Sequence, residues 1–213
     1  MKQLLLLLFG VSLLITSCGE KMDELKQVAE VVKNLPEASE KMEETANKTE
    51  ERLKQRRAKG DTLAMHFSEL LKYLPQTIDG FKAEEPEGST TNSMGFSFTQ
   101  VSNHFTKATS EGEQSIKVEL IDYNAGYSYL SGLAYWANLN ISTENTDGFE
   151  RTVKTDIPDV YAYEKYSKSA KNASITYVIG YRFLLSINGD GVSGIEPLKD
   201  VANKMDLKKL AAF

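Results

Sequence analysis

The sequence predicts an α+β domain: an antiparallel β-sheet of about five or six strands with helices packed on it, preceded by a long charged N-terminal helical segment. Three observations lead to this prediction. Several runs alternate apolar and polar residues, as half-buried strands do. The connections between neighbouring runs are short, which favours antiparallel pairing. Apolar residues at helical spacing flank and interrupt these runs, so we expect helices against the sheet.

The charged segment occupies residues 18–60 and precedes a globular domain at residues 61–213. Residues 19–59 contain ten acidic and ten basic side chains, and the stretch from Glu37 to Lys59 is rich in good helix formers with only a thin apolar stripe. A helix of this kind bridges solvent or meets a partner helix. A stalk, a coiled-coil or docking segment and a disordered linker all stay open, as does a single continuous helix over residues 37–72.

The globular domain is expected to begin with a helix that ends at Pro75. The apolar stripe of this helix consists of Leu63, Phe67, Leu70, Leu71 and Leu74. Residues 76–92 are predicted to form a loop, and residues 188–191 (Asn-Gly-Asp-Gly) a turn. Strands are predicted at residues 94–99, 116–120, 149–154, 160–166, 174–179 and 183–187. Further helices are predicted at residues 125–137 and 195–205, with Asp206 capping a last turn through Leu210.

The N-terminus has a basic start and then a leucine-rich run, as a secretory signal has. The run ends in Ile15-Thr16-Ser17-Cys18, which resembles the lipobox of bacterial lipoproteins. The resemblance implies that residues 1–17 are a signal peptide and that Cys18, the single cysteine, carries a diacylglycerol with fatty acyl chains such as palmitate. Two or more chains hold a protein stably on a membrane. Membrane lipid is therefore an expected partner, through acylated Cys18.

The lipoprotein resemblance also implies a place in the cell envelope. Gly19 stands where some bacteria use an aspartate to retain lipoproteins in the inner membrane, which favours the outer membrane of a Gram-negative cell. The run from Glu20 to Glu24 is similar to the charged export signals of Bacteroidetes surface lipoproteins, so the domain faces either the periplasm or the cell surface. The order of helices and strands is similar to that of PsbP/Mog1-type domains. No residue role is transferred from that similarity.

Catalytic chemistry finds little support in the sequence. His66 and His104 are the only histidines, and no cysteine follows Cys18, so we expect no metal site, no cofactor and no catalytic residues. The net charge of −5 argues against binding of nucleic acid, because phosphate contacts need clustered cations. We therefore expect a non-enzymatic protein.

Tyrosine is unusually frequent, with ten residues, and aromatic side chains with a polar tip favour interfaces and ligand grooves. The candidate binding surface consists of Tyr123, Tyr127, Tyr129, Trp136, Tyr161 and Tyr163. The alternative is that these residues lie at the rim of the core. The expected function is an interaction or assembly module that contacts an envelope protein. The second hypothesis is a small-ligand-binding module with a tyrosine-rich groove near residues 123–136.

Overall fold

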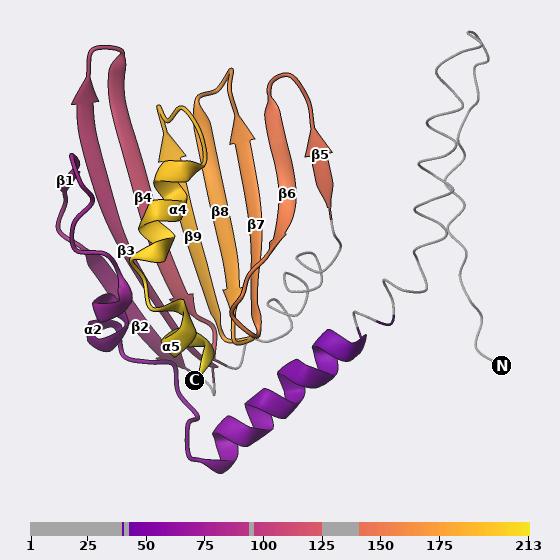
Figure 1. Cartoon of the computed structure of the whole chain (residues 1–213). Coiled ribbons are helices and arrows are strands. Elements are labelled where there is room, and N and C mark those ends of the chain that lie inside the picture. Colours follow the sequence, from indigo (N-terminus) through magenta and orange to yellow (C-terminus); the bar gives the residue numbers. More distant parts are fainter. Residues whose placement is uncertain (1–39, 41–42, 94–95, 125–140) are drawn as a thin grey trace, which may run out of the picture. The chain divides into compact units, whose positions relative to one another are not determined.

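The computed structural model describes residues 40, 43–93, 96–124 and 141–213 (Figure 1). The predicted signal peptide at residues 1–17, the predicted lipidation site Cys18 and most of the first half of the predicted spacer lie outside the described residues. The predicted helix over residues 125–137, with Tyr127, Tyr129 and Trp136, lies outside them as well.

One antiparallel sheet of nine strands dominates the described chain, which confirms an α+β domain but exceeds the five or six strands that the sequence predicts. The strands are β1 (Lys82–Ala83), β2 (Glu87–Ser93), β3 (Phe96–Thr109), β4 (Gly112–Asp122), β5 (Ser142–Glu144), β6 (Gly148–Lys154), β7 (Val160–Ser167), β8 (Asn172–Ile179) and β9 (Phe183–Asp190). Their order is β1-β3-β4-β9-β8-β7-β6-β5, and β2 pairs with β3 beside β1. A meander from β5 to β9 thus returns to pair β9 with β4.

The two faces of the sheet differ, because alternate residues of each strand point to opposite sides. One face, here called the helix-bearing face, packs against α2 (Phe67–Leu70), the 3₁₀ helix η1 (Leu71–Tyr73), α4 (Glu196–Asn203) and α5 (Leu207–Ala211) (Figure 1). The strand residues of this core include Val101, Phe105, Ile116, Val118, Leu120, Ile175, Ile179, Phe183, Leu185 and Ile187. The opposite side is here called the open face.

The C-terminal helices confirm two predictions. α4 falls within the predicted range 195–205 and buries Leu198 and Val201 on the sheet. Asp206 is the N-cap of α5 and accepts a hydrogen bond from the backbone N–H of Lys209 at 2.9 Å. A side-chain oxygen at this position satisfies one of the backbone donors that the first turn leaves free.

The predicted turn at residues 188–191 is wrong in its first three residues, which belong to β9. Gly189 lies in that strand because α4 packs closely over it: a Cβ atom there would stand 2.8 Å from Leu198 Cδ1. Gly191, with a φ of 70°, follows the end of the strand. An Asn-Gly pair usually marks a turn, but here the glycine is required by helix-to-sheet distance.

Two further predictions are corrected at the start of the domain. The predicted helix from Leu63 to Leu74 is reduced to α2 and η1, and Leu63 itself is 58% exposed. The predicted loop at residues 76–92 contains β1 and most of β2. These strands show no alternation of apolar and polar residues, because they are exposed along almost their whole length.

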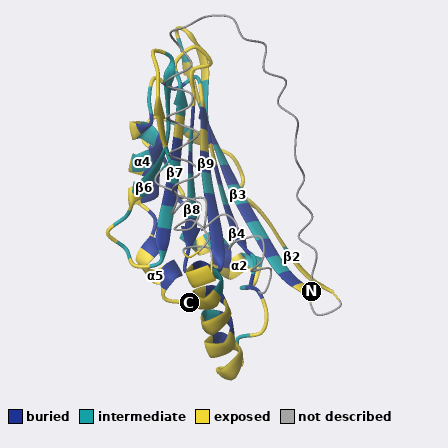
Figure 2. Cartoon of the chain, turned by 90° about the vertical axis from the view of Figure 1, so that its right-hand side faces the viewer, coloured by how far each residue is buried: buried dark blue, intermediate teal, exposed yellow. Residues whose placement is uncertain are grey.

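Residues 43–58 of the predicted spacer form a helix that stops before Gly60, whose φ is 81°. Residues 37–72 are therefore not one continuous helix. Most of the surface of the 43–58 helix is exposed, in contrast to the buried middle of the strands (Figure 2). Its buried side chains are Thr45, Thr49, Leu53 and Arg56, which share one side of the helix. This part of the spacer therefore contacts the domain and is not solvated all round.

Candidate functional site

The open face of the sheet divides along the strands into an apolar and a polar part. At the end of the sheet near the β8–β9 turn, Ile121, Val178, Tyr181 and Leu184 form a second, smaller hydrophobic cluster. Phe98, Tyr123 and Tyr161 pack against it. Two residues further along each strand the side chains become polar, so the open face presents hydrogen-bonding groups over the rest of its length.

At the centre of the polar part, β8 and β9 present a patch of four neutral side chains. Thr176 lies opposite Ser186 in the strand register, and Ser174 lies opposite Asn188. All four are half-buried or exposed. Within the described residues, none of these four side chains makes a hydrogen bond. We name Ser174, Thr176, Ser186 and Asn188 the hydroxyl patch.

On the strands to either side of the hydroxyl patch, Glu119 and Glu150 each pair with a lysine. On the β4 side, Glu119 accepts a hydrogen bond from Gln100 Nε2 at 2.9 Å and lies 3.2 Å from Lys117 Nζ. On the β6–β7 side, Glu150 accepts a hydrogen bond from Tyr163 and lies 3.7 Å from Lys165 Nζ. The face therefore has ionic margins and an uncharged, hydrogen-bonding centre.

Three of the six residues of the predicted aromatic surface lie within the described chain, and all three face the open side. Tyr161 and Tyr163 alternate along β7, and Tyr123 follows β4 and packs edge-on against Phe98. The Tyr161 and Tyr181 hydroxyls lie 2.8 Å apart. Burial, aided by this neighbouring tyrosine, raises the pKa of Tyr181. Tyr127, Tyr129 and Trp136 lie outside the described residues, so the predicted groove as a whole is not described.

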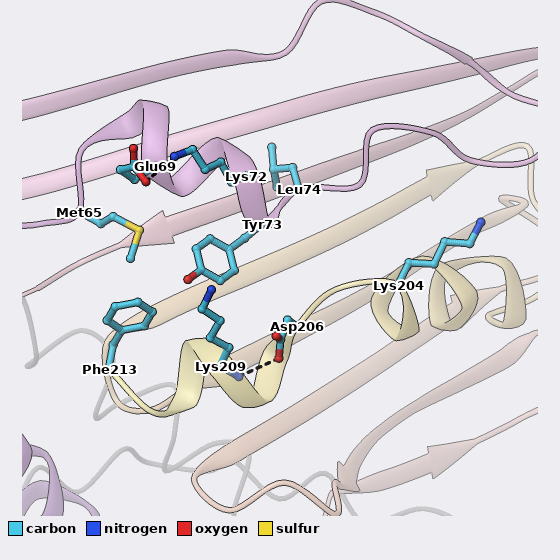
Figure 3. A pocket seen from close by; sticks show the side chains of 9 residues that line it. All are labelled: Met65, Glu69, Lys72, Tyr73, Leu74, Lys204, Asp206, Lys209 and Phe213. Atoms are coloured by element: carbon cyan, nitrogen blue, oxygen red, sulfur yellow. Dashed lines mark hydrogen bonds and ion pairs between the residues drawn. The ribbon is translucent and has the colours of Figure 1, made fainter.

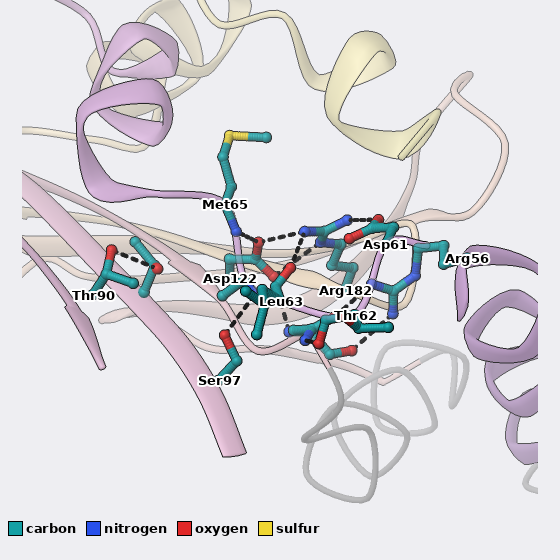
Figure 4. Close-up of polar contacts among 12 residues, drawn as sticks. Arg56, Asp61, Thr62, Leu63, Met65, Thr90, Ser97, Asp122 and Arg182 are labelled. Atoms are coloured by element: carbon teal, nitrogen blue, oxygen red, sulfur yellow. Dashed lines mark hydrogen bonds and ion pairs between the residues drawn. The ribbon is translucent and has the colours of Figure 1, made fainter. Parts of the chain in front are cut away.

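A buried ionic cluster closes the sheet at the end where β9 begins (Figure 4). Asp122 is fully buried and accepts hydrogen bonds from Arg182 Nε at 2.9 Å and Nη2 at 2.8 Å. Arg182 Nη1 donates a further bond to Asp61 at 2.6 Å. Desolvation lowers the pKa of Arg182, but its bonds to Asp122 and Asp61 outweigh that effect and raise the pKa above its ordinary value. The guanidinium thus stays charged while buried.

The same cluster fixes the chain between the 43–58 helix and α2. Asp122 Oδ2 accepts the backbone N–H of Met65 at 2.7 Å, and Ser97 Oγ accepts that of Ala64 at 2.6 Å. The carbonyl of Leu63 accepts a bond from Arg182 Nη2 at 3.4 Å. An extended segment with no ladder partner needs such side-chain bonds to satisfy its buried backbone groups.

The 43–58 helix meets the sheet end through two arginines. Arg56 is 7% exposed and donates to the side-chain oxygen of Asn124 at 3.0 Å and to its carbonyl at 2.7 Å. Arg52 pairs with Asp159 in the turn before β7. Desolvation and the nearby charge of Arg182 lower the pKa of Arg56. The contact is therefore mainly polar, with Leu53 as the one buried apolar residue among residues 43–58.

Backbone strain gathers at this end of the sheet. The described chain has four non-glycine residues with positive φ, and three lie here: Asn124 at 44°, Asp159 at 58° and Tyr181 at 56°. Gly180 and Tyr181 form a tight turn closed by the Arg182 N–H on the Ile179 carbonyl at 3.1 Å. Such conformations cost free energy and persist only where the surroundings hold them. Arg56 bonds to Asn124 and Arg52 bonds to Asp159, and these contacts help to hold the two residues in place.

A pocket lies away from the hydroxyl patch, on the helix-bearing face. This pocket, of about 560 Å³, opens between η1 and α5, where Lys209 Nζ lies 5.4 Å from the centre of the Tyr73 ring (Figure 3). Its lining combines aromatic walls with mixed charges from Met65, Glu69, Lys72, Tyr73, Leu74, Lys204, Asp206, Lys209 and Phe213. None of the tyrosines of the predicted surface lines it.

Sequence reasoning missed the buried ionic cluster and the hydroxyl patch. A signal for the cluster was present, since Asp122 and Arg182 are charged residues inside apolar runs. Their pairing was not readable, because 60 residues separate them along the chain. The hydroxyl patch gave no signal beyond the ordinary polar positions of a half-buried strand.

Within the described ranges, no group of three or more His, Cys, Asp or Glu side chains is placed to hold a metal ion. No helix in the described part of the chain is long and apolar enough to cross a membrane. Compared with protein-family models, curated proteins and solved structures, the chain matches none of them.

Proposed function

We propose that this chain is a cell-envelope lipoprotein that acts as a non-enzymatic interaction module. In this proposal acylated Cys18 holds the chain to the outer membrane of a Gram-negative cell, facing either the periplasm or the surface. The partner is a protein of the same envelope, and the open face of the sheet is the surface that it contacts. The lipobox-like run supports the anchor, and the hydroxyl patch supports the contact.

The single observation that carries the contact is the unpaired hydrogen-bonding capacity at the centre of a wide sheet face. Six strands from β3 to β6 lie side by side in the order given above, which spans about 24 Å at a strand spacing of about 4.8 Å. This is the width of a protein-sized contact. A partner that donates or accepts at Thr176 and Ser186 replaces water on groups that the domain itself leaves free.

The margins of this face also suit a protein partner. Glu119 and Glu150 are already paired with Lys117 and Lys165, so a partner that covers the hydroxyl patch does not meet either carboxylate as an isolated charge. Tyr163 adds an aromatic ring with a polar tip, a type that is enriched at interfaces. The proposed contact is therefore polar and of modest affinity.

The contact is tested with a photo-crosslinking amino acid placed at Thr176 in the hydroxyl patch, in living cells. A matched control places it at Thr146, an exposed residue of the turn between β5 and β6. We expect one envelope protein to be captured at Thr176 and not at Thr146, and Thr176→Arg to abolish its co-purification. Equal capture at both positions, or no captured protein together with a small molecule that co-purifies with the domain, contradicts the proposal.

The anchor is tested separately by feeding cells a fatty acid that carries a clickable label. The wild-type chain should incorporate the label, and Cys18→Ser should not, because the thiol is the expected attachment point. Ser17→Ala serves as the matched control, since a small residue before the cysteine is retained. Label on Cys18→Ser, or none on the wild-type chain, refutes lipidation at Cys18.

A further inference from the structure

We propose that β2 is a dimerisation edge, where a second copy of this chain adds its own β2 in antiparallel register and continues the sheet. Dimerisation at this edge is independent of the function proposed for the open face. β2 is a long, exposed edge strand that is mostly neutral, whereas the two other edge strands, β1 and β5, are short and carry charged residues.

The outer side of β2 has backbone N–H and C=O groups that can pair with another strand. β2 pairs with β3 along all seven residues, from Glu87 opposite Ser102 to Ser93 opposite Phe96, without a bulge. Six of its seven residues are exposed. Among the described residues, its ladder goes to β3 alone. A regular strand whose outer N–H and C=O groups face solvent is a template for another strand.

The other edge strands in the described chain carry features that prevent pairing with another strand. β1 has two residues and includes Lys82, and β5 has three and includes Glu144. Between β1 and β2 stand two glutamates and Pro86. Short length, charge and proline are the usual devices that prevent edge-to-edge pairing. From Gly88 to Ser93, β2 uses none of them, since every residue there is small or neutral.

The strand is also held in a fixed shape before any partner arrives. On the helix-bearing face, Thr90 Oγ1 accepts the backbone N–H of Phe67 at 2.9 Å and lies 3.0 Å from Thr99 Oγ1. Asn92 Oδ1 accepts the Ser97 hydroxyl. A preorganised edge pays little ordering entropy on pairing.

A second copy fits this edge better than an unrelated peptide. From Gly88 to Ser93 the side chains of β2 are too small to wall a deep side-chain pocket, and specificity for a foreign sequence in strand addition comes from such pockets. Full overlap of two copies centres the two-fold axis on Thr90. Ser89 then lies opposite Thr91, and Glu87 lies opposite Ser93. No like charges oppose one another, and hydroxyl side chains across a strand pair are favourable.

Two-fold pairing of this kind keeps the same face of both sheets on the same side, so the two open faces become one continuous surface. A seven-residue strand pair is about 24 Å long and buries less area than a typical stable dimer needs. The expected dimer is therefore weak, and the test must capture a transient contact.

The test mixes two single-cysteine chains of different size, one Ser89→Cys and one Thr91→Cys, both full-length and with Cys18→Ser. Opposite residues of an antiparallel pair lie within disulfide reach. On mild oxidation the mixture should form a hetero-dimer at least tenfold faster than either chain forms a homo-dimer. The matched control pair, Ser142→Cys with Glu144→Cys on β5, should crosslink no faster than random collision.

Sedimentation of the otherwise unaltered chain supplies the second readout. Thr91→Lys should weaken self-association at least tenfold, because it places a charge on the edge of each copy, whereas Thr143→Lys on β5 should leave it unchanged. Crosslinking of the β2 pair no faster than of the β5 pair overturns the proposal. So does self-association that Thr91→Lys and Thr143→Lys affect equally, or a chain that stays monomeric up to millimolar concentration.

Discussion

Removal of the Asp122 carboxylate should destabilise the domain more than any change at its surface. Asp122 is fully buried and holds four donors: two guanidinium nitrogens of Arg182 at 2.9 and 2.8 Å, and the backbone N–H groups of Met65 and Asn124 at 2.7 and 2.8 Å. Asp122→Ala leaves these donors without an acceptor and one buried cation half-paired. Breaking a buried pair in this way costs about 3–5 kcal/mol.

Urea unfolding measures this loss. With a slope of about 2 kcal/mol per M, a loss of 3–5 kcal/mol lowers the unfolding midpoint by roughly 2 M while leaving the slope unchanged. The control is Glu69→Ala, which removes an ion pair with Lys72 whose side chains are 58% and 66% exposed. Its expected cost is below about 1 kcal/mol, because exposed pairs contribute little.

A double variant separates the pair from the packing around it. Asp122→Leu with Arg182→Met replaces both charges by apolar groups, and such replacements are often neutral. The double variant should therefore be more stable than Asp122→Leu alone. A stabilising role for the buried pair is contradicted if Asp122→Ala costs less than about 1 kcal/mol, if Glu69→Ala costs as much, or if the effects of Asp122→Leu and Arg182→Met are additive.

Three further predictions concern the core, the titration of a tyrosine and the helix contact. Gly189→Ala should cost about 1–3 kcal/mol in thermal or urea unfolding, because the added methyl meets Leu198 at 2.8 Å. Gly194→Ala, with no atom within 4 Å of the added methyl, should change stability by less than about 0.5 kcal/mol. Burial, and then a nearby glutamate, raises the pKa of Tyr177 from 10.0 to about 12, so its stabilising effect is complete below pH 10 and lost as the pH rises towards 12. In urea unfolding at pH 9.5–12, Tyr177→Phe should therefore flatten the fall in stability. Arg56→Ala should raise amide hydrogen exchange over residues 43–58 and leave β9 protected, and equal exchange in the two chains would contradict a polar attachment of the helix.

The strands that the sequence predicted are those with one buried face. In β4, Ile116, Val118 and Leu120 are fully buried while Lys117 is exposed, so the period of two is visible in the sequence. β2 has no buried residue, and its sequence from Gly88 to Ser93 is therefore that of a loop. Its pairing is decided by β3, which no pattern within residues 87–93 reports.

The length of the first helix of the domain was overestimated for a related reason. Leu63 falls at helical spacing with Phe67 and Leu70, but its neighbours bind the sheet end instead: Ala64 donates to Ser97, and Met65 donates to Asp122. Those acceptors lie 33 and 57 residues away along the chain. These tertiary hydrogen bonds determine the conformation of residues 63–65 despite the helical spacing of Leu63, and the spacing alone does not predict them.

The buried side of the 43–58 helix, which contacts the sheet, also could not be predicted from the local sequence. The sequence predicts a thin apolar stripe, whereas three of the four buried residues of this helix, Thr45, Thr49 and Arg56, are polar and only Leu53 is apolar. Thr49 Oγ1 donates to the Thr45 carbonyl at 2.7 Å, so its hydroxyl is satisfied within the helix. A polar stripe of this kind cannot be distinguished from a solvated one by residue type.

This composition sets how the helix is held. Leu53 is the one buried apolar side chain among residues 43–58, so burial of apolar surface contributes little to the attachment of the helix. The position of the helix on the sheet depends instead on the bonds of Arg56 to Asn124 and of Arg52 to Asp159. Both acceptors are residues with positive φ. The contacts that fix the helix therefore also bind two residues in strained backbone conformations.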